Sequence, residues 1–536
     1  MVAALALWAP RLRGPLDLRY DAGVYYVLGT ALGDGHGYRL LNEPGRIEAV
    51  QYPPLLPMIV AAHQRLTGSR DPAVAGQALR FTWAALFLVY ALAVYALARR
   101  WLRPGWALVA SLLVVLHLEL LWLSDALFAE LPFACATVLF LLAAERDDRR
   151  GRAALFGGAA YLLRASGGAL LIAWIVDALL ARRVLEAALR AALAALPVLV
   201  WHAYLAEVQA RPAFTHPAYA YQRAPYNFYN VPYAANMAYR DAFAPELGLA
   251  DANDLVRRVA ANALSLPTRL GESIGVRAEG PLHPVFLLRE PPPPGAPTPP
   301  PRPLAIHRLG CALLGLVAAA GLAMLALDGI RLAPLVWLAS LAAMTLTPWP
   351  SQFGRYLMPL APLTAIGFAL VLENSSRVAS RPLQTAAGAA VGVLLAAELV
   401  VLGAVFSARH TPVAAIPGAT PQRLFFYSRR WRLHDEGLAW LKTVAAHDAI
   451  VATATPQRLY LLSGARAVFP PFDSDPERAE RQLREVPVDW VVIDDLDVLD
   501  VARRYAERAV LAHPERWRLV YDSGTAGPRI YRRIRS

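Results

Sequence analysis

The sequence predicts an α-helical polytopic membrane protein with about ten or eleven transmembrane helices and a small α/β domain at its C-terminal end. Of the 536 residues, 57% are hydrophobic and only 18% are charged, and the mean hydropathy is +0.36. Apolar runs close to the ~20 residues that cross a bilayer recur along most of the chain. Beyond residue 407 the hydrophobicity falls, and short β-rich runs alternate with polar helical stretches.

The apolar runs predict the membrane spans directly. We expect helices at residues 77–98, 105–123, 126–144, 153–163, 165–181, 187–206, 304–326, 332–348, 356–373 and 385–406. The run at 153–163 is short for a span. The opening "MVAALALWAP" is too short to cross and lacks the basic start and cleavage site of a signal peptide. We expect either a short tilted first helix or, as the favoured interpretation, a start codon upstream of Met1.

The positive charge predicts the topology. The formal net charge of +12 comes from arginines that gather in every second connection between the runs. This pattern is typical of cytoplasmic loops rather than of a surface that binds nucleic acid. The clusters are Arg99, Arg100 and Arg103; Arg146, Arg149, Arg150 and Arg152; Arg182 and Arg183; Arg331; and Arg377 and Arg381. Residues 15–76, 207–303 and 407–536 are therefore expected on the external side.

Several further features bound the class of protein. Lys442 is the only lysine against many arginines, which suggests a GC-rich bacterial genome and hence a bacterial inner membrane. Cys135 and Cys311 fall inside predicted membrane helices, so they are not a disulfide framework for the external parts. The stretch "REPPPPGAPTPPPRP" at 289–303 predicts a stiff polyproline spacer that closes the second external loop.

Two domains follow from this organisation. Residues 1–406 are expected to form a transmembrane domain with external loops at 15–76 and 207–303. Residues 407–536 are expected to form a small extracytoplasmic α/β domain, since strand-like runs at 449–454, 488–495 and 517–523 alternate with helical stretches at 435–447 and 476–486. That domain carries no phosphate-binding glycine loop and no metal-ligand spacing, so a structural or acceptor-docking role is favoured over catalysis.

The first external loop places an acid between apolar runs. In residues 19–57, Asp21 precedes a stretch that predicts an amphipathic interfacial helix. A turn with His36 and Tyr38 follows, then Tyr52 and a second interfacial helix. His36 and His216 lack metal-like partners at useful spacing, so they are interpreted as polar loop residues or acceptor contacts.

Four more charged residues lie at predicted outer edges of the membrane. "LWLSDALFAELPF" supplies Asp125 and Glu130 near a helix start, where an acid is often only a cap or dipole partner. Glu130 should lie deeper in the apolar segment, where an ionisable group is costly and usually functional. Arg164 and Arg355 could each simply snorkel to headgroups. Two arginines and several acids on one side of a membrane are better explained by a site for a phosphate and a hydroxyl.

The order of these motifs resembles a known family. "YDAGVYYVLGTALGDGHGY", "YPPLLP", "SDALFAELPF", "YLLRASGG" and "GRYLMPLAP" follow one another as in the GT-C superfamily of integral-membrane glycosyltransferases. The nearest branches are the bacterial relatives of protein O-mannosyltransferases and of aminoarabinose lipid A transferases. The resemblance covers nearly the whole chain, including the external α/β tail. It rests on the order of the motifs and on topology, because none of them is specific by itself.

The resemblance implies an inverting enzyme that transfers a hexose or pentose from a polyprenyl-phosphate donor to an external lipid, glycan or protein acceptor. Asp21 matches the essential aspartate of the first external loop, which implies a general base or orienting group for the acceptor hydroxyl. Glu130 matches the acid of the second external loop, and Asp125 would assist it.

The donor phosphate would be held by arginine. Arg355 in "GRYLMP", with Tyr356 beside it, is the first candidate, because a guanidinium offers two parallel donors and keeps its charge. Arg164 is the second. Many relatives follow the first-loop aspartate with another acid, whereas Ala22 stands here, which weakens a metal held by adjacent carboxylates. A divalent metal would need Asp21 to meet Asp125 or Glu130 in space, and the chemistry does not require one.

The loop at 214–243 carries eight aromatic residues between Phe214 and Tyr239. They could form an interfacial aromatic belt or a lid that stacks on a sugar or prenyl chain and excludes water. The polar surroundings favour the lid. The residues expected to contact substrate are Tyr38, Tyr52, His36, Tyr221, Tyr226 and Tyr229.

Two other functions remain open from the sequence. A transporter or lipid flippase would also have many helices and buried charges, but no inverted repeat is found and the charges gather at one face. A scaffold that displays the tail domain would leave Asp21, Glu130 and Arg355 without a role. The enzyme hypothesis requires these three residues to line one outward-facing cavity beneath residues 214–243.

Overall fold

The computed structural model describes residues 1–144, 150–277, 302–378, 380–408, 427–446, 448–496 and 499–534. The chain divides into two compact units. The helical unit consists of Met1–Leu12, Arg80–Val200 and Leu255–Thr411, and the mixed unit consists of Arg13–Leu79, Trp201–Asp254 and Pro412–Ser536. Both external loops of the prediction, as far as residue 254, thus share a unit with the C-terminal segment. The polyproline stretch at 289–303 lies almost entirely outside the described residues.

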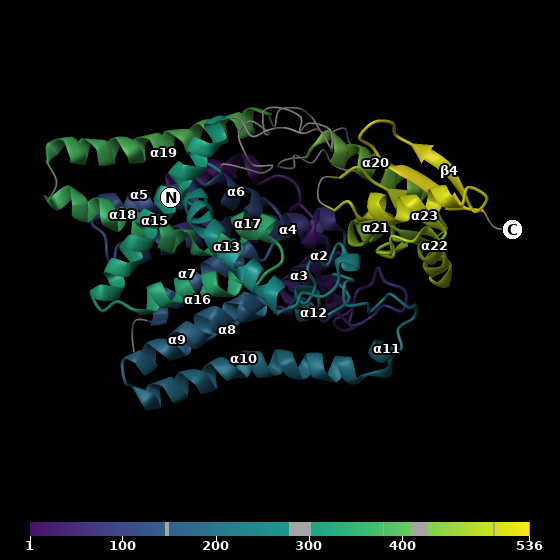
Figure 1. The fold of residues 1–536 in the computed structure, drawn as a ribbon, viewed down its shortest axis with the longest axis horizontal. Coiled ribbons are helices and arrows are strands. Elements are labelled where there is room, and N and C mark those ends of the chain that lie inside the picture. Colours follow the sequence, from purple (N-terminus) through teal and green to yellow (C-terminus); the bar gives the residue numbers. More distant parts are fainter. Residues whose placement is uncertain are drawn as a thin grey trace. The chain divides into compact units, whose positions relative to one another are not determined.

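Apolar helices occupy all of the predicted runs (Figure 1). They are α4 (Pro72–Ala98), α5 (Pro104–Val115), α6 (Leu118–Asp125), α7 (Glu130–Ala144), α8 (Arg150–Leu163), α9 (Gly168–Leu180), α10 (Val184–Ala210), α15 (Arg302–Leu327), α16 (Leu332–Thr345), α17 (Phe353–Leu357), α18 (Ala361–Val378) and α19 (Arg381–Ala408). A short α1 (Val2–Trp8) precedes them, and α13 (Ala252–Glu272) lies between α10 and α15. Cys135 lies in α7 and Cys311 in α15, so both are inside apolar helices as predicted, and both are free and buried.

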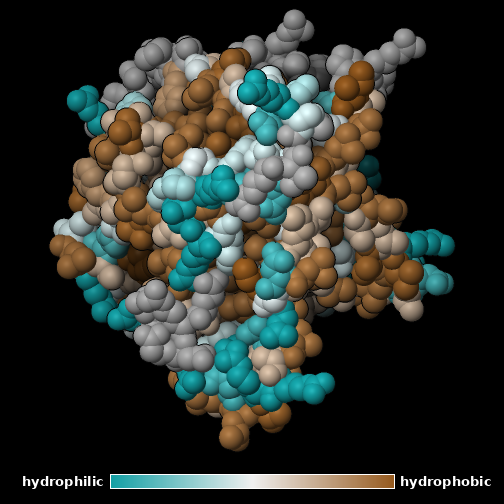
Figure 2. Space-filling view, turned by 90° about the vertical axis from the view of Figure 1, so that its left-hand side faces the viewer, coloured by the Kyte–Doolittle hydropathy of each residue, from teal (hydrophilic) through white to brown (hydrophobic). Residues whose placement is uncertain are grey.

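Five stretches within the described residues are long and apolar enough to cross a membrane, or six if the bent pair α5 and α6 is one span. They are Pro72–Ala98, Val184–Ala210, Ala305–Leu327, Pro350–Ser376 and Gln384–Phe406. Shorter apolar helices lie in three of the other predicted runs, at Glu130–Ala144, Ala165–Leu180 and Leu332–Thr345, and α8 occupies the run at 153–163. Figure 2 shows hydrophobic side chains over much of one face of the molecule. The chain is therefore a multi-pass membrane protein.

The predicted span at 105–123 is not continuous, because the chain bends by 53° between α5 and α6. His117 occupies the break. Its Nδ1 accepts a hydrogen bond from the backbone N–H of Glu119 (3.2 Å) and so caps α6. Its Nε2 lies 2.8 Å from the Glu272 carbonyl oxygen, which assigns the proton to Nε2. Because His117 caps the start of α6, α5 ends before it. The hydrophobicity of the segment does not reveal this break.

The mixed unit begins with a pair of packed helices, α2 (Asp21–Gly33) and α3 (Leu55–Thr67). The two approach so closely that a Cβ on Gly29 would lie 2.5 Å from Cβ of Val60. Nine residues of α2 are buried, so the prediction of an amphipathic surface helix was wrong. A third helix, α21 (Pro456–Ser463), explains this burial, since its Tyr460 and Leu461 pack on Val27 and Ala31 of α2.

A five-stranded sheet forms the core of the C-terminal α/β domain, residues 427–534 of the mixed unit. The strands are β1 (Ile450–Ala452), β2 (Arg466–Val468), β3 (Trp490–Ile493), β4 (Trp517–Asp522) and β5 (Arg529–Arg533), in the order β2-β1-β3-β5-β4. β1 runs parallel to β2 and β3, and β5 runs antiparallel to β3 and β4. The helices α20 (Arg429–Val444), α21, α22 (Pro476–Glu485) and α23 (Glu507–Ala512) complete the domain.

The predicted strands β1, β3 and β4 and the helices α20 and α22 are confirmed. β2 and β5 were missed because β2 has only three residues and β5 carries three arginines in five positions. The core joins Leu438 and Leu441 of α20 to Val451, Val492 and Ile530 of the sheet.

A buried acid in this domain gives a stability prediction. Asp494, 3% exposed, follows β3, and burial raises its pKa to about 7 although the Leu496 N–H donates to its Oδ1 (3.1 Å). Between about pH 4 and pH 7 the unfolded chain has lost a proton that the folded chain keeps, so the free energy of unfolding falls as the pH rises. Asp494→Asn keeps the acceptor oxygen and cannot ionise. We expect its melting temperature to exceed that of the wild type at pH 8, and the gap to shrink at pH 5.

Asp522→Asn is the matched control. Asp522 is exposed and accepts in the same way from the Gly524 N–H (2.8 Å). Its melting-temperature difference from the wild type should be the same at both pH values. A gap for Asp494→Asn that does not grow with pH would contradict the prediction.

Candidate functional site

Asp21 is the first residue of α2 and is held by a tyrosine from the aromatic loop. The Tyr229 hydroxyl donates to Asp21 Oδ1 (3.0 Å). The Tyr229 ring stacks on Phe469 of the α/β domain (5.6 Å between centroids) and also contacts Tyr52 (6.2 Å). Tyr20, directly before Asp21, has φ 57° and ψ −140°, a conformation that residues other than glycine rarely adopt. The predicted residues Asp21, Tyr52 and Tyr229 are therefore brought together.

The other tyrosine of the first loop has a supporting place. Tyr38 is buried between Trp201 and Tyr204, and its hydroxyl donates to the Tyr52 carbonyl oxygen (2.9 Å). Burial raises the pKa of Tyr38 well above its usual value, so the phenol remains a donor. His36 is exposed in the turn after α2.

The aromatic loop at 214–243 is packed into the mixed unit by buried polar contacts. Glu43 accepts from the Tyr219 hydroxyl (2.7 Å) and from Gln222 Nε2 (3.2 Å), and Gln51 donates to Asn236 (3.1 Å). Burial raises the pKa of Glu43, which those two donors partly offset.

The predicted tyrosines of this loop contact the α/β domain. Tyr226 stacks on Phe472 (5.3 Å), and the Tyr221 hydroxyl donates to the Phe469 carbonyl oxygen (3.2 Å). His216 is exposed. In this conformation the loop is a packed wall beside Asp21, and its role as a lid stays a prediction.

In the helical unit, three of the predicted residues form one cluster. Glu130, the first residue of α7, is 1% exposed, and its Oε1 accepts from both Arg164 and Arg355. Arg164 follows the last residue of α8, and Arg355 lies in α17. The rings of Tyr356 and Phe128 lie 5.2 Å from the Arg164 guanidinium and 4.4 Å from the Arg355 guanidinium, respectively. The cluster thus joins three segments on one carboxylate oxygen.

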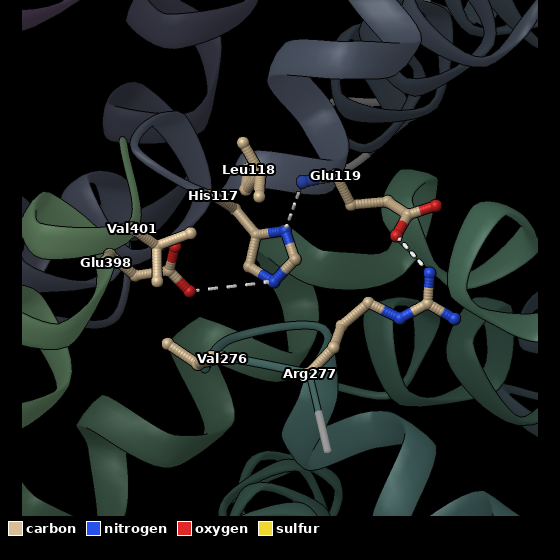
Figure 3. A pocket seen from close by; sticks show the side chains of 7 residues that line it. All are labelled: His117, Leu118, Glu119, Val276, Arg277, Glu398 and Val401. Atoms are coloured by element: carbon tan, nitrogen blue, oxygen red, sulfur yellow. Dashed lines mark hydrogen bonds and ion pairs between the residues drawn. The ribbon is translucent and has the colours of Figure 1, made fainter. Parts of the chain in front are cut away.

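An ion pair between Arg277 and Glu119 lies close to this cluster in space. Arg277 Nη1 donates to Glu119 Oε2 (2.6 Å), and Figure 3 shows these two side chains pointing toward each other. A Cβ on Gly354 would lie 2.9 Å from Cζ of Arg277, so the glycine before Arg355 leaves room for this guanidinium. The pocket of Figure 3 is completed by His117, Leu118, Val276, Glu398 and Val401.

Asp125 belongs to a different cluster from Glu130. It is the last residue of α6, not near a helix start as predicted, and there the helix dipole disfavours a negative charge. Its Oδ1 accepts from Arg80 Nη1 (2.7 Å) and from Arg11 Nε and Nη2 (3.2 and 3.1 Å). All three side chains are at most 2% exposed. The triad ties the N-terminal segment to α4 and α6.

The sequence analysis missed Arg11, Arg80, Glu119 and Arg277. Arg80 and Glu119 lie inside predicted spans, where an ionisable residue is itself a signal of a buried partner. Arg11 and Arg277 lie outside the predicted spans and offered no such signal. Among the residues that the structure describes, no group of three or more His, Cys, Asp or Glu side chains is arranged to hold a metal ion.

No family model and no curated protein sequence matches the chain. Among solved structures, the archaeal oligosaccharyltransferase AglB from Archaeoglobus fulgidus, in complex with an inhibitory peptide and a dolichol-phosphate, is similar with a TM-score of 0.49 and 15% identity over 98% of this chain and 73% of that chain. ArnT from Cupriavidus metallidurans bound to undecaprenyl phosphate gives a TM-score of 0.43 and 12% identity over 100% of this chain and 97% of that chain.

Both structures are less than 25% identical to this chain, so the similarity concerns the fold alone. Because the TM-scores are below 0.5, substrate and mechanism are argued below from the residues of this chain alone.

The Asp125 triad gives a test of structure against catalysis. Asp125→Asn leaves two buried guanidiniums without their carboxylate, a change that typically costs about 3–5 kcal/mol. We expect a lower melting temperature but normal turnover per folded molecule in nanodiscs. Asp328→Asn, at an exposed position after α15, should change neither quantity. Normal stability with lost turnover would instead support the catalytic role that the sequence suggested for Asp125.

Proposed function

We propose that this protein transfers a sugar from a polyprenyl-phosphate donor to an acceptor hydroxyl outside the cytoplasm of a bacterial cell. The observation that carries the proposal is the Glu130 cluster, in which one buried carboxylate oxygen binds the guanidiniums of Arg164 and Arg355. Two arginines at the edges of apolar helices, with Arg277 beside them, suit an anionic ligand at membrane depth.

The arginines would serve the leaving group. When the bond from the anomeric carbon to the phosphate oxygen breaks, its electron pair stays on polyprenyl phosphate. A guanidinium aimed at that oxygen stabilises the developing charge, and it is worth more in an apolar setting than in water. Arg355 is the first candidate for this contact, because its planar fork matches a phosphate. Arg164, with Tyr356 under its guanidinium, is the second. Glu130 would orient both.

Asp21 would serve the acceptor. In an inverting transfer the acceptor hydroxyl oxygen attacks the anomeric carbon as the leaving group departs, and its proton passes to the Asp21 carboxylate. Tyr229 supports this role, because its hydroxyl orients one carboxylate oxygen. No metal ion takes part in this scheme.

A transporter or lipid flippase is the second candidate. A buried arginine inside the helical unit favours it, because Arg190, 3% exposed, pairs with the half-buried Asp177 (3.0 Å). Such pairs also mark ion and substrate pathways in transporters. Movement of a labelled lipid across the bilayer without release of polyprenyl phosphate would establish that function instead.

Asp21→Asn tests the proposal most directly. The substitution preserves shape and removes the base, so we expect turnover to fall by ~10² or more while donor binding is retained. The measurement is the release of polyprenyl phosphate in nanodiscs from a panel of polyprenyl-phosphate sugars with envelope extracts as acceptors. Asp71→Asn is the control. Asp71 is an exposed residue of the same loop that has no role in the proposed reaction, and its carboxylate accepts a hydrogen bond from the Ala73 N–H (2.8 Å). Equal turnover in the two variants would remove Asp21 from the mechanism.

Arg355→Lys tests the phosphate contact. A lysine keeps the charge but loses the bidentate geometry, so we expect a donor KM raised by roughly tenfold. The control is Arg103→Lys, another arginine paired with a buried glutamate, Glu373 (3.4 Å), in a cluster predicted to face the cytoplasm. An unchanged donor KM in Arg355→Lys would move the phosphate site elsewhere in the chain.

A further inference from the structure

The two residues that lead into α2, Arg19 and Tyr20, are held by side chains of the C-terminal α/β domain. Arg19 is fully buried, and it donates to Asp17 Oδ2 through Nε (2.9 Å) and Nη2 (2.6 Å). Its guanidinium lies 5.2 Å from the Trp431 ring and 5.3 Å from the Tyr427 ring. A buried cation between two aromatic faces is a specific interaction. It fixes the backbone two residues before Asp21.

Tyr20 makes the next contact along the chain. Its ring meets Trp431 edge to face, with 5.2 Å between the centroids and 70° between the planes. The backbone of Tyr20 has φ 57°, and such a conformation persists only where the surroundings hold it. Trp431, in the first turn of α20 and 5% exposed, is the large side chain that packs on this ring. It thus meets both residues that precede Asp21.

A buried ion pair between Asp435 and Arg458 contacts one of these aromatic residues, Tyr427. Asp435, one turn after Trp431, accepts from Arg458 through Nε (3.1 Å) and Nη2 (2.6 Å) and from the Tyr427 hydroxyl (2.6 Å). Arg458 lies on α21, the helix that packs against α2. At that crossing a Cβ on Gly23 would lie 3.2 Å from Cβ of Gln457. The first turn of α2 is therefore set by α20 and α21 together.

We infer that Trp431 is a positioning residue for Asp21, and hence that the α/β domain is part of the catalytic apparatus. This inference rests on the proposed function, in which Asp21 is the base. Without the indole, the Tyr20 ring loses its edge-to-face contact, and we expect the backbone of Tyr20 to relax toward a negative φ. That change would rotate the first turn of α2 and move the carboxylate away from the acceptor hydroxyl. A displacement of this kind lowers the rate of the chemical step and leaves binding of the donor phosphate unchanged.

The experiment compares two tryptophans of the same helix in the full-length protein. Trp431→Leu removes the contact with Tyr20. Trp440→Leu is the matched control, since the Trp440 ring contacts Tyr521 (4.8 Å) and Trp490 (6.3 Å) within the domain's own core. We expect Trp431→Leu to lower kcat by roughly 10- to 100-fold with the donor KM unchanged. Trp440→Leu should lower the melting temperature and keep kcat per folded molecule. Trp431→Phe, which restores a ring, should recover most of the rate.

The same variants in an Asp21→Asn background separate positioning from general damage. If Trp431 acts through Asp21, Trp431→Leu causes no further loss in that background. A loss that multiplies with that of Asp21→Asn, or an equal loss of kcat in Trp440→Leu, would overturn the inference. The proposed function fails separately, because it is refuted when Asp21→Asn alone keeps normal turnover. If Trp431→Leu does not fold, the kcat of Trp431→Phe decides, and a rate as low as that of Asp21→Asn would refute positioning by the aromatic ring.

Discussion

The cost of burying charge is the constraint on which the helical unit depends. An ionised carboxylate or guanidinium in an apolar interior must be paired and hydrogen-bonded. Glu130 meets this requirement with arginines from two other segments, and Asp125 does so with Arg11 and Arg80. Each cluster therefore joins parts of the chain that apolar packing alone could arrange in several registers. Each ion pair therefore specifies which helices meet and in which register, whereas contacts among Leu, Ala and Val are less specific.

The two clusters differ in how far their arginine side chains are exposed. Both Arg11 and Arg80 are at most 2% exposed, so the Asp125 triad is closed by protein. The guanidinium side chains of Arg164 and Arg355 are 20% and 12% exposed around a carboxylate that is 1% exposed. The guanidiniums of Arg164 and Arg355 are therefore accessible, as the proposed contact with a phosphate requires, and those of Arg11 and Arg80 are not. This difference in access, five residues apart in the sequence, separates a structural acid from a candidate functional one.

Much of the fold follows from local sequence, and the pairings do not. Apolar runs located the helices, and the alternation of β-rich and polar helical runs located three strands and two helices of the C-terminal domain. The order of motifs singled out Asp21, Glu130 and Arg355. The partners of these residues could not be predicted, because Arg11 and Asp125 are 114 positions apart and Arg355 and Glu130 are 225 positions apart. The bend at His117 depends equally on a tertiary contact, with the carbonyl of Glu272.

The mixed unit shows why a tail domain without a ligand motif can still matter for a site. Asp21 stands at the start of a helix whose entry is an unfavourable backbone conformation at Tyr20. Aromatic side chains of the tail, Trp431 on one side and Phe469 behind Tyr229 on the other, pack against the groups that flank the carboxylate. Such rings have few rotamers, so holding them against Tyr20 and Tyr229 costs little conformational entropy. A domain without a recognisable ligand motif can in this way fix the geometry of a carboxylate that lies more than four hundred residues earlier in the chain.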